Sequence, residues 1–463
     1  MLAVCSFFLA TNQGQMSSER AALLNAAHQA VQTRMQSPGE WDQQPQFHFH
    51  APAQWMNDPN GPIYFRGWYH VFYQFNPYGD HWARMHWGHA RSRNLVDWED
   101  MAIALWPTKS RGEDHIYSGS SFLPPSGKLP MAFYTSISGQ RKPEQWAAVA
   151  EDADLKTWRK AEKNPVVTSN LEEWRDPFLF AYKGGTYMVT GGGEKGRGIV
   201  ALYKAADADL TQWEFRRILF HHPDADVRNI ECPNIAQFGV KWLLLVSVHG
   251  RVESFVGYLD SEMEFVSESR GVLNEGSYAS QLMLGPKGEV IHLAWMHTEE
   301  HKGWNGFLTL PSLLKVSRDG VLTRTPVPQL RQLREEKSEL GSKTFSGEWV
   351  LPETTGGELL EIEGDVEYRG ATALVVQLRR SADGSRAVRL EWPASQRTRH
   401  IHLYLDHGVA DDYEGLGRSI RFNALPEDQG VALRAEGGEV RIKSLSVYEL
   451  RPAMFDHSFF TRK

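Results

Sequence analysis

A short motif recurs along the first half of this chain and limits the folds that the chain can adopt. Each copy consists of a polar residue, a leucine, two further residues and a tryptophan, and the copies are Asn94–Trp98, Asp154–Trp158 and Asp209–Trp213. Their tryptophans lie about 55 to 60 residues apart, a period typical of the blades of a β-propeller. Strand-like runs separated by Gly, Asn and Asp precede each copy. The motif therefore predicts a repeating all-β domain.

The remainder of this region extends the same pattern. Runs at Val290–Trp295 and Phe307–Leu310 provide strands for a fifth unit, and residues 47–330 contain almost no helical periodicity. We therefore expect residues 47–330 to form a five-bladed β-propeller.

Three acidic residues keep step with the repeat. Asp176 follows Asp58 by about two repeats, and Glu231 follows Asp176 by one, which predicts equivalent places in blades one, three and four. Innermost strands of a propeller face a common channel, so these carboxylates would converge and shift each other's pKa. Such a cluster suits acid/base catalysis. The alternative is structural: each acid caps a turn or pairs with a neighbour, as Asp176 would with Arg175.

Composition narrows the function further. The net charge of −7 and the pI near 6.2 give no electrostatic footprint for nucleic acid, and no run is long enough to span a bilayer. Cys5 and Cys232 are the two cysteines, so neither a disulfide framework nor a zinc cluster is expected. His81, His86 and His89 lack a carboxylate that would complete a metal site, and we expect them to be hydrogen-bonded strand and loop residues. Some of the 16 tryptophans would serve as platforms for a sugar.

The segments around the propeller differ in composition. Leu2–Ala10, within residues 1–16, is apolar but has no preceding positive charge, so it is either the remnant of an export signal or an ordinary N-terminus. The first case places the protein outside the cell or in the periplasm, and the second in the cytoplasm. Residues 17–46 are expected to contain one amphipathic helix, 17–36, and a linker. A linker at 331–345, a β-sandwich at 346–452 and a tail at 453–463 complete the chain.

Six tracts in order resemble glycoside hydrolase family 32, the invertase, levanase and inulinase group. They are Trp55–Gly61, Tyr73–Pro77, Trp87–Ala90, Tyr117–Ser120, Arg175–Pro177 and Glu231–Pro233. The resemblance runs from about Phe47 to about Leu450 and implies a five-bladed propeller joined to a β-sandwich. It also implies retaining hydrolysis of β-fructofuranosides without a metal or organic cofactor.

Position by position, the resemblance makes Asp58 the nucleophile, Glu231 the general acid/base, and Asp176 the residue that holds the fructose hydroxyls. A retaining glycosidase needs one ionised and one protonated carboxyl group. We expect a tight, hydrogen-bonded turn to keep Asp58 ionised and Glu231 to stay protonated until needed. The substrate-binding residues implied are Asn57, Gln74, Trp82, Tyr117, Ser118, Arg175, Tyr278 and Trp295, the last of which alternatively belongs to the core.

Three positions depart from the family pattern. Glu275–Ala279 lacks the usual acid just before its aromatic residue, Asn234 replaces an Asp, and Ser312 replaces an Arg. The substrate is therefore open: sucrose comes first, but levan or inulin would use the same pocket. Fructosyl transfer, a catalytically silent fructan-binding protein and an endo-acting arabinan hydrolase are the alternatives. The sequence does not indicate the oligomeric state.

Overall fold

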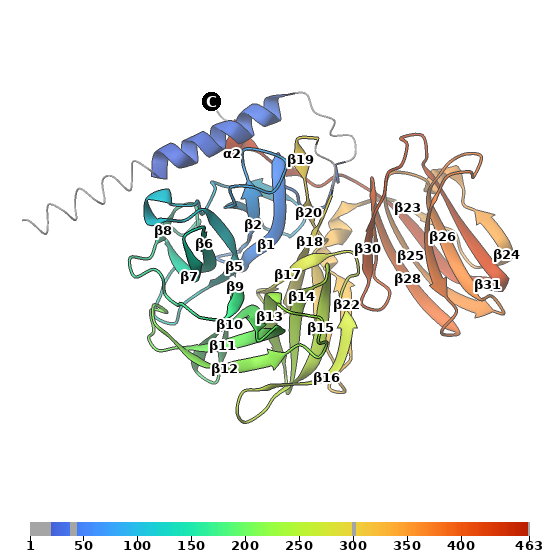
Figure 1. Cartoon of the computed structure of the whole chain (residues 1–463). Coiled ribbons are helices and arrows are strands. Elements are labelled where there is room, and N and C mark those ends of the chain that lie inside the picture. Colours follow the sequence, from blue (N-terminus) through green and yellow to red (C-terminus); the bar gives the residue numbers. More distant parts are fainter. Residues whose placement is uncertain (1–19, 38–43, 299–301, 462–463) are drawn as a thin grey trace, which may run out of the picture.

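The computed structural model describes residues 20–37, 44–298 and 302–461, and these are almost entirely β-structure. Within these described residues, helix is confined to residues 20–36, α2 (Ser458–Thr461) and three short 3-10 helices, η1 (Lys109–Arg111), η2 (Pro328–Leu333) and η3 (Glu353–Thr355). Figure 1 shows a ring of sheets, coloured blue to yellow, beside a separate orange and red body. The apolar stretch Leu2–Ala10 lies outside the described residues. None of the described helices combines the length and apolar character needed to cross a bilayer.

Five small sheets make up the larger body. The first contains, in spatial order, β19 (Trp304–Asn305), β1 (Gln54–Phe65), β2 (Trp68–Asn76), β3 (His86–Ser92), β4 (Trp98–Asp100) and β32 (Phe455–Asp456). The second contains β5 (His115–Phe122), β6 (Met131–Ser138), β7 (Arg141–Ala150) and β8 (Trp158–Lys160). The third contains β9 (Glu172–Tyr182), β10 (Gly185–Glu194), β11 (Arg197–Ala205) and β12 (Trp213–His221).

The last two sheets follow in chain order. The fourth contains β13 (Glu231–Phe238), β14 (Lys241–Val248), β15 (Arg251–Leu259) and β16 (Phe265–Val272). The fifth contains β17 (Tyr278–Leu284), β18 (Val290–Met296), β21 (Ser312–Val316) and β22 (Leu322–Pro326), with β20 (Phe307–Leu308) paired to β18. The first four sheets are each built on four consecutive antiparallel strands, whereas the fifth skips two short strands. Consecutive innermost strands contact one another from β1 through β5, β9, β13 and β17 and back to β1, which closes a β-propeller.

One turn geometry recurs between the third and fourth strands of the sheets. Leu95, Leu155 and Leu210 of the repeated motif are buried and adopt left-handed φ values of 64°, 57° and 57°. The tryptophans that follow begin β4, β8 and β12. The fourth and fifth sheets have the same turn with Met263 (φ 64°) and Gly320 (φ 86°) in place of leucine. The repeated feature is thus a turn with a left-handed backbone conformation at one position, which is occupied by leucine, methionine or glycine.

The smaller body is a sandwich-like sheet of nine strands. They are β23 (Arg334–Glu339), β24 (Lys343–Val350), β25 (Leu359–Arg369), β26 (Ala373–Arg380), β27 (Val388–Pro393), β28 (Thr398–Asp406), β29 (Val409–Asp412), β30 (Arg418–Arg421) and β31 (Gly430–Leu450). The first part of β31 pairs with β26 and its second part with β25, so this long strand belongs to both layers. A buried apolar cluster that includes Leu374, Leu403 and Leu433 fills the space between the layers. Residues 331–345, expected as a linker, carry β23 and the start of β24, which pair with β31.

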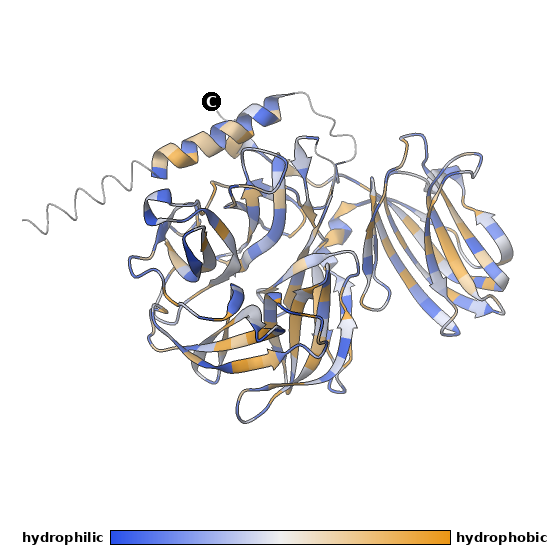
Figure 2. Cartoon of the chain, in the orientation of Figure 1, coloured by the Kyte–Doolittle hydropathy of each residue, from blue (hydrophilic) through white to orange (hydrophobic). Residues whose placement is uncertain are grey.

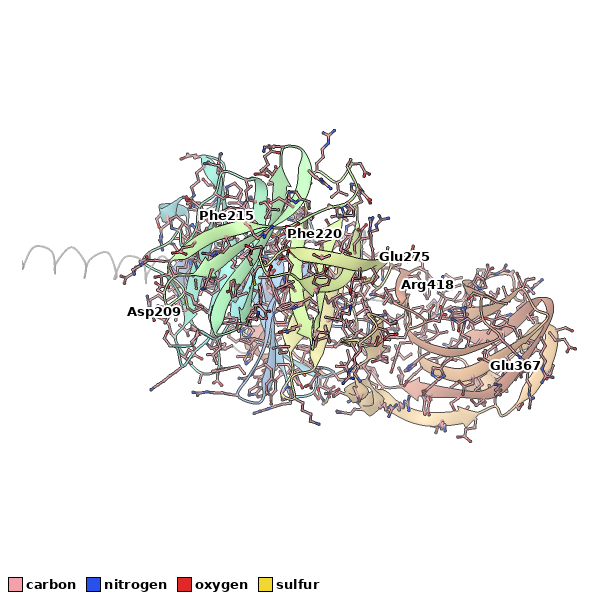
Figure 3. The ribbon with its side chains drawn as sticks, turned by 90° about the horizontal axis from the view of Figure 1, so that it is seen from below. Asp209, Phe215, Phe220, Glu275, Glu367 and Arg418 are labelled. Carbon is pink, nitrogen blue, oxygen red and sulfur yellow. The ribbon has the colours of Figure 1, made fainter. Side chains whose placement is uncertain are left out.

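The two bodies meet along a short backbone seam. Glu275, just before β17, forms an isolated bridge with Arg418 of β30, and the Ser419 N–H donates to the Glu275 carbonyl oxygen over 2.8 Å. Figure 3 places the two labelled residues side by side between the bodies. Buried His48, just before the propeller, is held by Asp406 (2.7 Å) and Asp411 (2.8 Å) of the sandwich. The all-β prediction of a propeller joined to a sandwich-like domain is confirmed.

The helix at residues 20–36 packs on the outside of the propeller. Ala27 and Val31 are fully buried against the apolar cluster that includes first-sheet residues such as Val71, and Leu24 packs at its edge. The His28 ring meets Phe459 and Phe460 of α2 edge-on at 5.0 and 5.6 Å. Figure 2 shows apolar residues concentrated along the strands and hydrophilic residues at the connecting turns. The helix therefore covers the first sheet with one apolar face, as its spacing predicts.

Candidate active site

Each of the five innermost strands is interrupted by a β-bulge. The interruptions run from Met56 to Pro59, Ile116 to Gly119, Arg175 to Phe178, Glu231 to Asn234 and Tyr278 to Gln281. A bulge adds residues to one strand and turns its side chains away from the regular alternation. Because all five lie near the N-terminal ends of their strands, the re-aimed side chains gather at one end of the channel.

The three acids occupy these bulges, but not at equivalent positions. Each of these bulges contains two unpaired residues. Asp58 is the second unpaired residue of its bulge, Asp176 is the first of its bulge, and Glu231 is the paired residue just before its bulge. The sequence predicted that the three acids occupy equivalent places in their blades. They do lie on equivalent strands, but their positions along those strands differ, so the prediction is wrong for the residues. The stagger gives the carboxylates different surroundings: Asp176 is 4% exposed, whereas the Glu231 side chain is 29% exposed.

All eleven residues singled out from the sequence line one cavity of about 360 Å³. Its lining residues are Trp55, Asn57, Asp58, Gln74, Trp82, Tyr117, Ser118, Glu173, Arg175, Asp176, Glu231, Cys232, Tyr278 and Trp295. Trp55, Glu173 and Cys232 are the members that sequence reasoning did not place in the site. The available signal was their position in the chain: Trp55 and Glu173 lie two residues before Asn57 and Arg175, and Cys232 directly follows Glu231.

Asp58 accepts hydrogen bonds from the side chains of Ser118 and Asn57, and the Cys232 thiol also approaches it. The Ser118 hydroxyl donates to Oδ2 over 2.5 Å, and the Asn57 amide donates to Oδ1 over 2.9 Å. The indole N–H of Trp55 donates to Asn57 Oδ1 over 2.7 Å and so orients that amide. Burial raises the pKa of Asp58, and the hydrogen bonds from Ser118 and Asn57 oppose this rise. The hydrogen bonds expected to keep Asp58 ionised are thus present, although the effect of burial on its pKa is larger than theirs.

Asp176 shares a polar contact zone with Cys232. The Cys232 backbone N–H donates to Asp176 Oδ2 over 2.9 Å, and the thiol lies 3.5 Å from the same oxygen and 3.7 Å from Asp58 Oδ2. Burial raises the pKa of Asp176 to about 7, with Arg175 opposing and the charges of Glu231 and Asp58 adding to the rise. Burial also raises the pKa of the Cys232 thiol well above its usual value. The cysteine is thus a neutral donor beside the acids.

Glu231 is held from both sides. Arg175 Nη2 donates to Oε1, and the Tyr278 hydroxyl donates to Oε2. The other terminal nitrogen of Arg175, Nη1, donates to Glu173 Oε2 over 2.7 Å, while its Nε stays 4.0 Å from Asp176. The structural alternative, in which Arg175 simply pairs with Asp176, therefore does not describe this cluster. Arg175 instead bridges the carboxylates of Glu173 and Glu231.

Aromatic rings form part of the cavity wall. Trp82 is 45% exposed and stacks on His115 with ring centroids 5.0 Å apart. Trp295 is partly exposed to the cavity and packs against Trp55 at 5.9 Å and His297 at 5.0 Å. An exposed indole face is suited to packing against the apolar face of a sugar ring. Trp295 thus belongs to the cavity wall rather than to the core alone.

Two of the departing positions have structural explanations. Asn234 is buried; its Nδ2 donates to the carbonyl oxygens of Cys232 (3.0 Å) and Ser280 (2.9 Å), and its Oδ1 accepts from the Leu282 N–H (2.8 Å). This amide joins β13 to β17, and an aspartate would lack the donors. Ser312 is buried away from the cavity, where its hydroxyl donates to the Leu310 carbonyl oxygen over 3.1 Å.

The histidines expected to be structural do not line the cavity. His86 Nδ1 contacts the Arg84 carbonyl oxygen at 2.5 Å, His89 Nε2 contacts His70 Nδ1 at 3.0 Å, and His81 lies 3.7 Å from Asp80. Two other groups of the described residues have ligand atoms close together: Glu363 with His400 and His402, and His222 with Asp224 and Glu253. Both lie outside the cavity, and Arg334 and Arg270 respectively already pair with their carboxylates.

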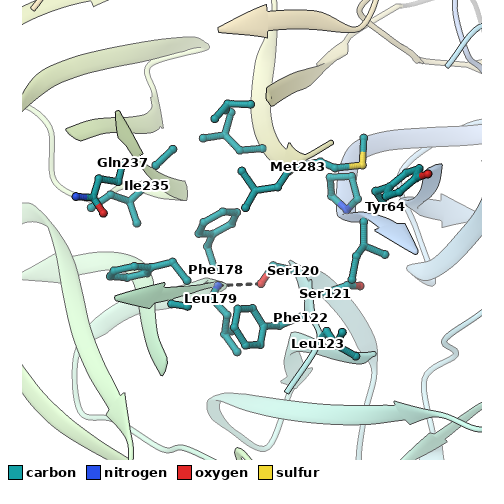
Figure 4. Close-up of a pocket in the computed structure, with 18 of the residues that line it drawn as sticks. Tyr64, Ser120, Ser121, Phe122, Leu123, Phe178, Leu179, Ile235, Gln237 and Met283 are labelled. Atoms are coloured by element: carbon teal, nitrogen blue, oxygen red, sulfur yellow. Dashed lines mark hydrogen bonds between the residues drawn. The ribbon is translucent and has the colours of Figure 1, made fainter. Parts of the chain in front are cut away.

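A second cavity, of about 400 Å³, lies at the other end of the same innermost strands. Figure 4 shows Phe178, Ile235 and Met283 around it, with the Ser120 hydroxyl accepting from the Leu179 N–H over 3.2 Å. The described residues that line this cavity include no acid and no base. Its surface thus offers packing but no acid/base pair. The candidate active site is the cavity that contains Asp58, Asp176 and Glu231, named the carboxylate cavity.

Comparison with known proteins adds independent information. The family model "Glycosyl hydrolases family 32 N-terminal domain" matches residues 48–326. The chain is 29% identical over 420 residues to a sucrose-6-phosphate hydrolase of Escherichia coli, covering 84% of each chain. It is 29% identical over 378 residues to insoluble isoenzyme 3 of the β-fructofuranosidase of Oryza sativa subsp. indica, covering 70% of this chain and 63% of that one. A levanase of Bacillus subtilis is 25% identical over 492 residues, with 89% and 71% covered.

Solved structures share the architecture. A β-fructofuranosidase of Bombyx mori superposes with a TM-score of 0.77 at 25% identity, covering 95% of this chain and 99% of that one. Fructan 1-exohydrolase IIa of Cichorium intybus superposes with a TM-score of 0.82 at 19% identity, covering 91% and 99%, and this likeness concerns the fold alone. Both matches extend over the propeller and the sandwich-like domain.

Proposed function

Since this chain belongs to glycoside hydrolase family 32, and is a glycoside hydrolase of the β-fructofuranosidase type, we propose that it releases terminal β-D-fructofuranosyl units with retention of configuration. One observation supports this most strongly. Asp58, Asp176 and Glu231 come from three different strands, line one cavity, and each receive hydrogen bonds from neighbours that fix their carboxyl oxygens. Carboxyl groups held in this way suit a reaction that needs one nucleophile and one proton donor.

In the proposed first step, Asp58 attacks the anomeric carbon of the fructosyl unit while Glu231 gives its proton to the departing glycosidic oxygen. The bond to the leaving sugar breaks as the bond to Asp58 forms, which yields a fructosyl ester. Ser118 and Asn57 each donate to one oxygen of Asp58, so they hold the carboxylate in a single orientation. Fixing a nucleophile in this way lowers the entropic cost of attack.

In the second step, Glu231 takes a proton from water, and the resulting hydroxide attacks the anomeric carbon and releases Asp58. Tyr278 and Arg175 hold the two oxygens of Glu231 and so set the direction of both proton transfers. Asp176 receives the Cys232 N–H on Oδ2, and we assign it to the hydroxyl groups of the fructosyl unit. Asn57, Gln74, Trp82, Tyr117, Ser118 and Trp295 line the remaining wall as proposed sugar-binding residues.

The fold assignment that accompanies this function is a propeller of five blades. Its support is the ring of five innermost strands and the five left-handed turns at Leu95, Leu155, Leu210, Met263 and Gly320. Each turn joins the third and fourth strands of one small sheet. We assign one blade to each sheet on this basis, including the fifth sheet with its skipped strands.

Sucrose is the first proposed substrate, and exo-cleavage of levan or inulin would use the same cavity. The relatives are named for sucrose 6-phosphate, β-fructofuranosides and levan, so their names do not decide between these substrates. Transfer of the fructosyl unit to a sugar would follow the same first step, with a sugar hydroxyl in place of water. A silent binding protein would not need all three carboxyl groups, and all three are present.

The test is product analysis on sucrose, an inulin-type oligosaccharide and levan with wild type, Asp58→Ala, Glu231→Ala and Glu172→Gln. Glu172 precedes Glu173 but is not among the residues that line the cavity, so its variant is the matched control. We expect free fructose from wild type and from the control, and none from the two alanine variants. Transfer would appear as longer oligosaccharides instead of fructose. A folded wild-type protein that releases nothing would contradict the hydrolase assignment.

The covalent step has its own measurement. Glu231→Gln should form the fructosyl ester from a substrate with an activated leaving group and then hydrolyse it slowly, because the general base is missing. Mass spectrometry of the quenched protein should find one added anhydrofructose unit on the peptide that carries Asp58. An unmodified Asp58 peptide under conditions where the leaving group is released would contradict the covalent mechanism.

A further inference from the structure

The carboxylate cavity is strongly acidic in composition. Its described lining residues include four carboxyl groups, on Asp58, Glu173, Asp176 and Glu231, and one cationic side chain, Arg175. The proposed mechanism keeps one proton on Glu231, and the other three carboxyl groups still outnumber the single guanidinium of Arg175. The cavity therefore offers a phosphate more acidic groups than cationic ones.

Arg175 is already committed to those carboxylates. Its Nη1 donates to Glu173, its Nη2 donates to Glu231, and its Nε faces Asp176 at 4.0 Å. Burial acts to lower the pKa of Arg175, but the charges of Asp176 and Glu231 outweigh it and raise that pKa. A phosphate at the cavity mouth would have to take Arg175 away from Glu173 or Glu231.

Glu173 adds negative charge at the entrance. Its side chain is 66% exposed, and its backbone adopts a left-handed φ of 48° that few non-glycine residues occupy. His115, which stacks under Trp82, has its pKa lowered by burial and by the nearby Lys109, so it is neutral at pH 7. Lys109 is not among the described residues that line the carboxylate cavity and pairs with Asp114 over 2.7 Å. The lining residues at the entrance thus present a carboxylate, neutral aromatic rings and hydroxyl groups to the part of the substrate that departs.

Recognition of a phosphate dianion in proteins depends on arginine or lysine side chains, or on backbone N–H groups at a helix start. Among the cavity residues that the structure describes, the single guanidinium is engaged and none lies at the start of a helix. From these observations we infer that the enzyme acts on uncharged fructosides and discriminates against sucrose phosphorylated on its glucosyl unit, with Glu173 as a specificity-determining residue. This inference rests on the proposed function and adds the charge class of the substrate to it.

The direct experiment compares kcat/KM for sucrose and for sucrose carrying a phosphate on its glucosyl C6. We expect kcat/KM to be at least about tenfold lower for the phosphorylated sugar at low salt. Raising NaCl from about 10 mM to about 500 mM should reduce the difference between the two kcat/KM values, because screening weakens repulsion between exposed charges. An equal or higher kcat/KM for the phosphorylated sugar would overturn the inference. A ratio that salt leaves unchanged would overturn the electrostatic explanation.

Glu173→Gln and Glu172→Gln form a matched pair of variants. Each variant removes one carboxyl group. Glu173 lines the carboxylate cavity, whereas Glu172 lines a separate cavity whose lining residues include Thr168 and Phe215. The kcat/KM for sucrose divided by the kcat/KM for phosphorylated sucrose should fall severalfold in Glu173→Gln and change little in Glu172→Gln. Equal changes in both variants would overturn the assignment of Glu173.

The outcomes separate this inference from the proposed function. Release of no fructose from sucrose, phosphorylated sucrose or levan by the folded wild-type protein contradicts the proposed hydrolase. Preferential cleavage of phosphorylated sucrose leaves the hydrolase intact and contradicts only the charge selectivity.

Discussion

Replacing Asp176 with asparagine should make the protein more stable while it abolishes fructose release. Asp176 is 4% exposed, and burial raises its pKa from the ordinary 3.8 to about 7. At a pH between these two values, Asp176 still holds its proton in the folded protein but has already released it in the unfolded chain. The free energy of unfolding contributed by this group therefore falls as pH rises from about 4 to about 7, and stays at the lower value above that.

The size of the effect follows from the same values. A difference of about three pKa units corresponds to about 4 kcal/mol, which is the upper limit of the cost of ionising Asp176 at pH 8. Asparagine keeps the shape, its Oδ1 can accept the Cys232 N–H, and it tolerates the left-handed φ of 60°. We expect Asp176→Asn to raise the free energy of unfolding by about 2 to 4 kcal/mol at pH 8, with a smaller gain at pH 5.

Urea unfolding followed by tryptophan fluorescence at pH 5 and pH 8 measures this gain. Asp406→Asn is the control of opposite sign. Although burial acts to raise the pKa of Asp406, hydrogen bonds from His48 and from the backbone outweigh it and lower that pKa. Removing its charge should therefore destabilise the protein at pH 8. An Asp176→Asn protein that is no more stable than wild type at pH 8, or whose gain is equal at both pH values, would refute the reasoning.

Three further predictions concern other parts of the molecule. Ser118→Ala removes a donor to the Asp58 carboxylate and should lower kcat/KM about 10-fold to 100-fold, with the acid limb of the pH profile moving to higher pH. Ser121→Ala on the same strand, whose hydroxyl has no hydrogen-bond partner among the described residues, should leave both unchanged. Burial acts to lower the pKa of His48, but its two aspartate partners raise it from 6.5 to about 9. Stability measured by urea should therefore fall as pH rises from about 6.5 to about 9, and His48→Gln should not show this loss. Leu210→Ala should lower the free energy of unfolding by about 2 to 5 kcal/mol, and a loss below about 1 kcal/mol would contradict its role in the turn.

The sequence was informative about the fold where one side chain marked a backbone conformation. Leucine followed by tryptophan identified the turns at Leu95, Leu155 and Leu210, because the leucines are buried there and the large tryptophan side chains are buried or, for Trp213, partly buried. The turns at Met263 and Gly320 keep the left-handed backbone but not the side chains, so a residue pattern missed them. Similarly, 331–345 reads as a charged linker because β23 carries exposed charged residues while its backbone pairs with β31.

The candidate site was predictable as a set of residues but not as a geometry. Spacing placed Asp58, Asp176 and Glu231 on corresponding strands, and these strands belong to one ring whose bulges line the carboxylate cavity. The bulges that stagger the three acids depend on strand register, which no spacing reveals. The contacts of Cys232 with two carboxylates depend on the same bulges.

The first sheet of the propeller combines strands from widely separated parts of the polypeptide. β1, which carries Asp58, pairs in parallel with β19, and β4 pairs in parallel with β32. During synthesis the ribosome therefore releases Asp58 long before Trp304 and Phe455, the partners that complete its sheet. Contacts of such high sequence separation slow folding, since a long loop must close before they form. Until Phe455 emerges, the outer edge of β4 is available to other strands, so a nascent chain stalled before that point should bind chaperones through this edge.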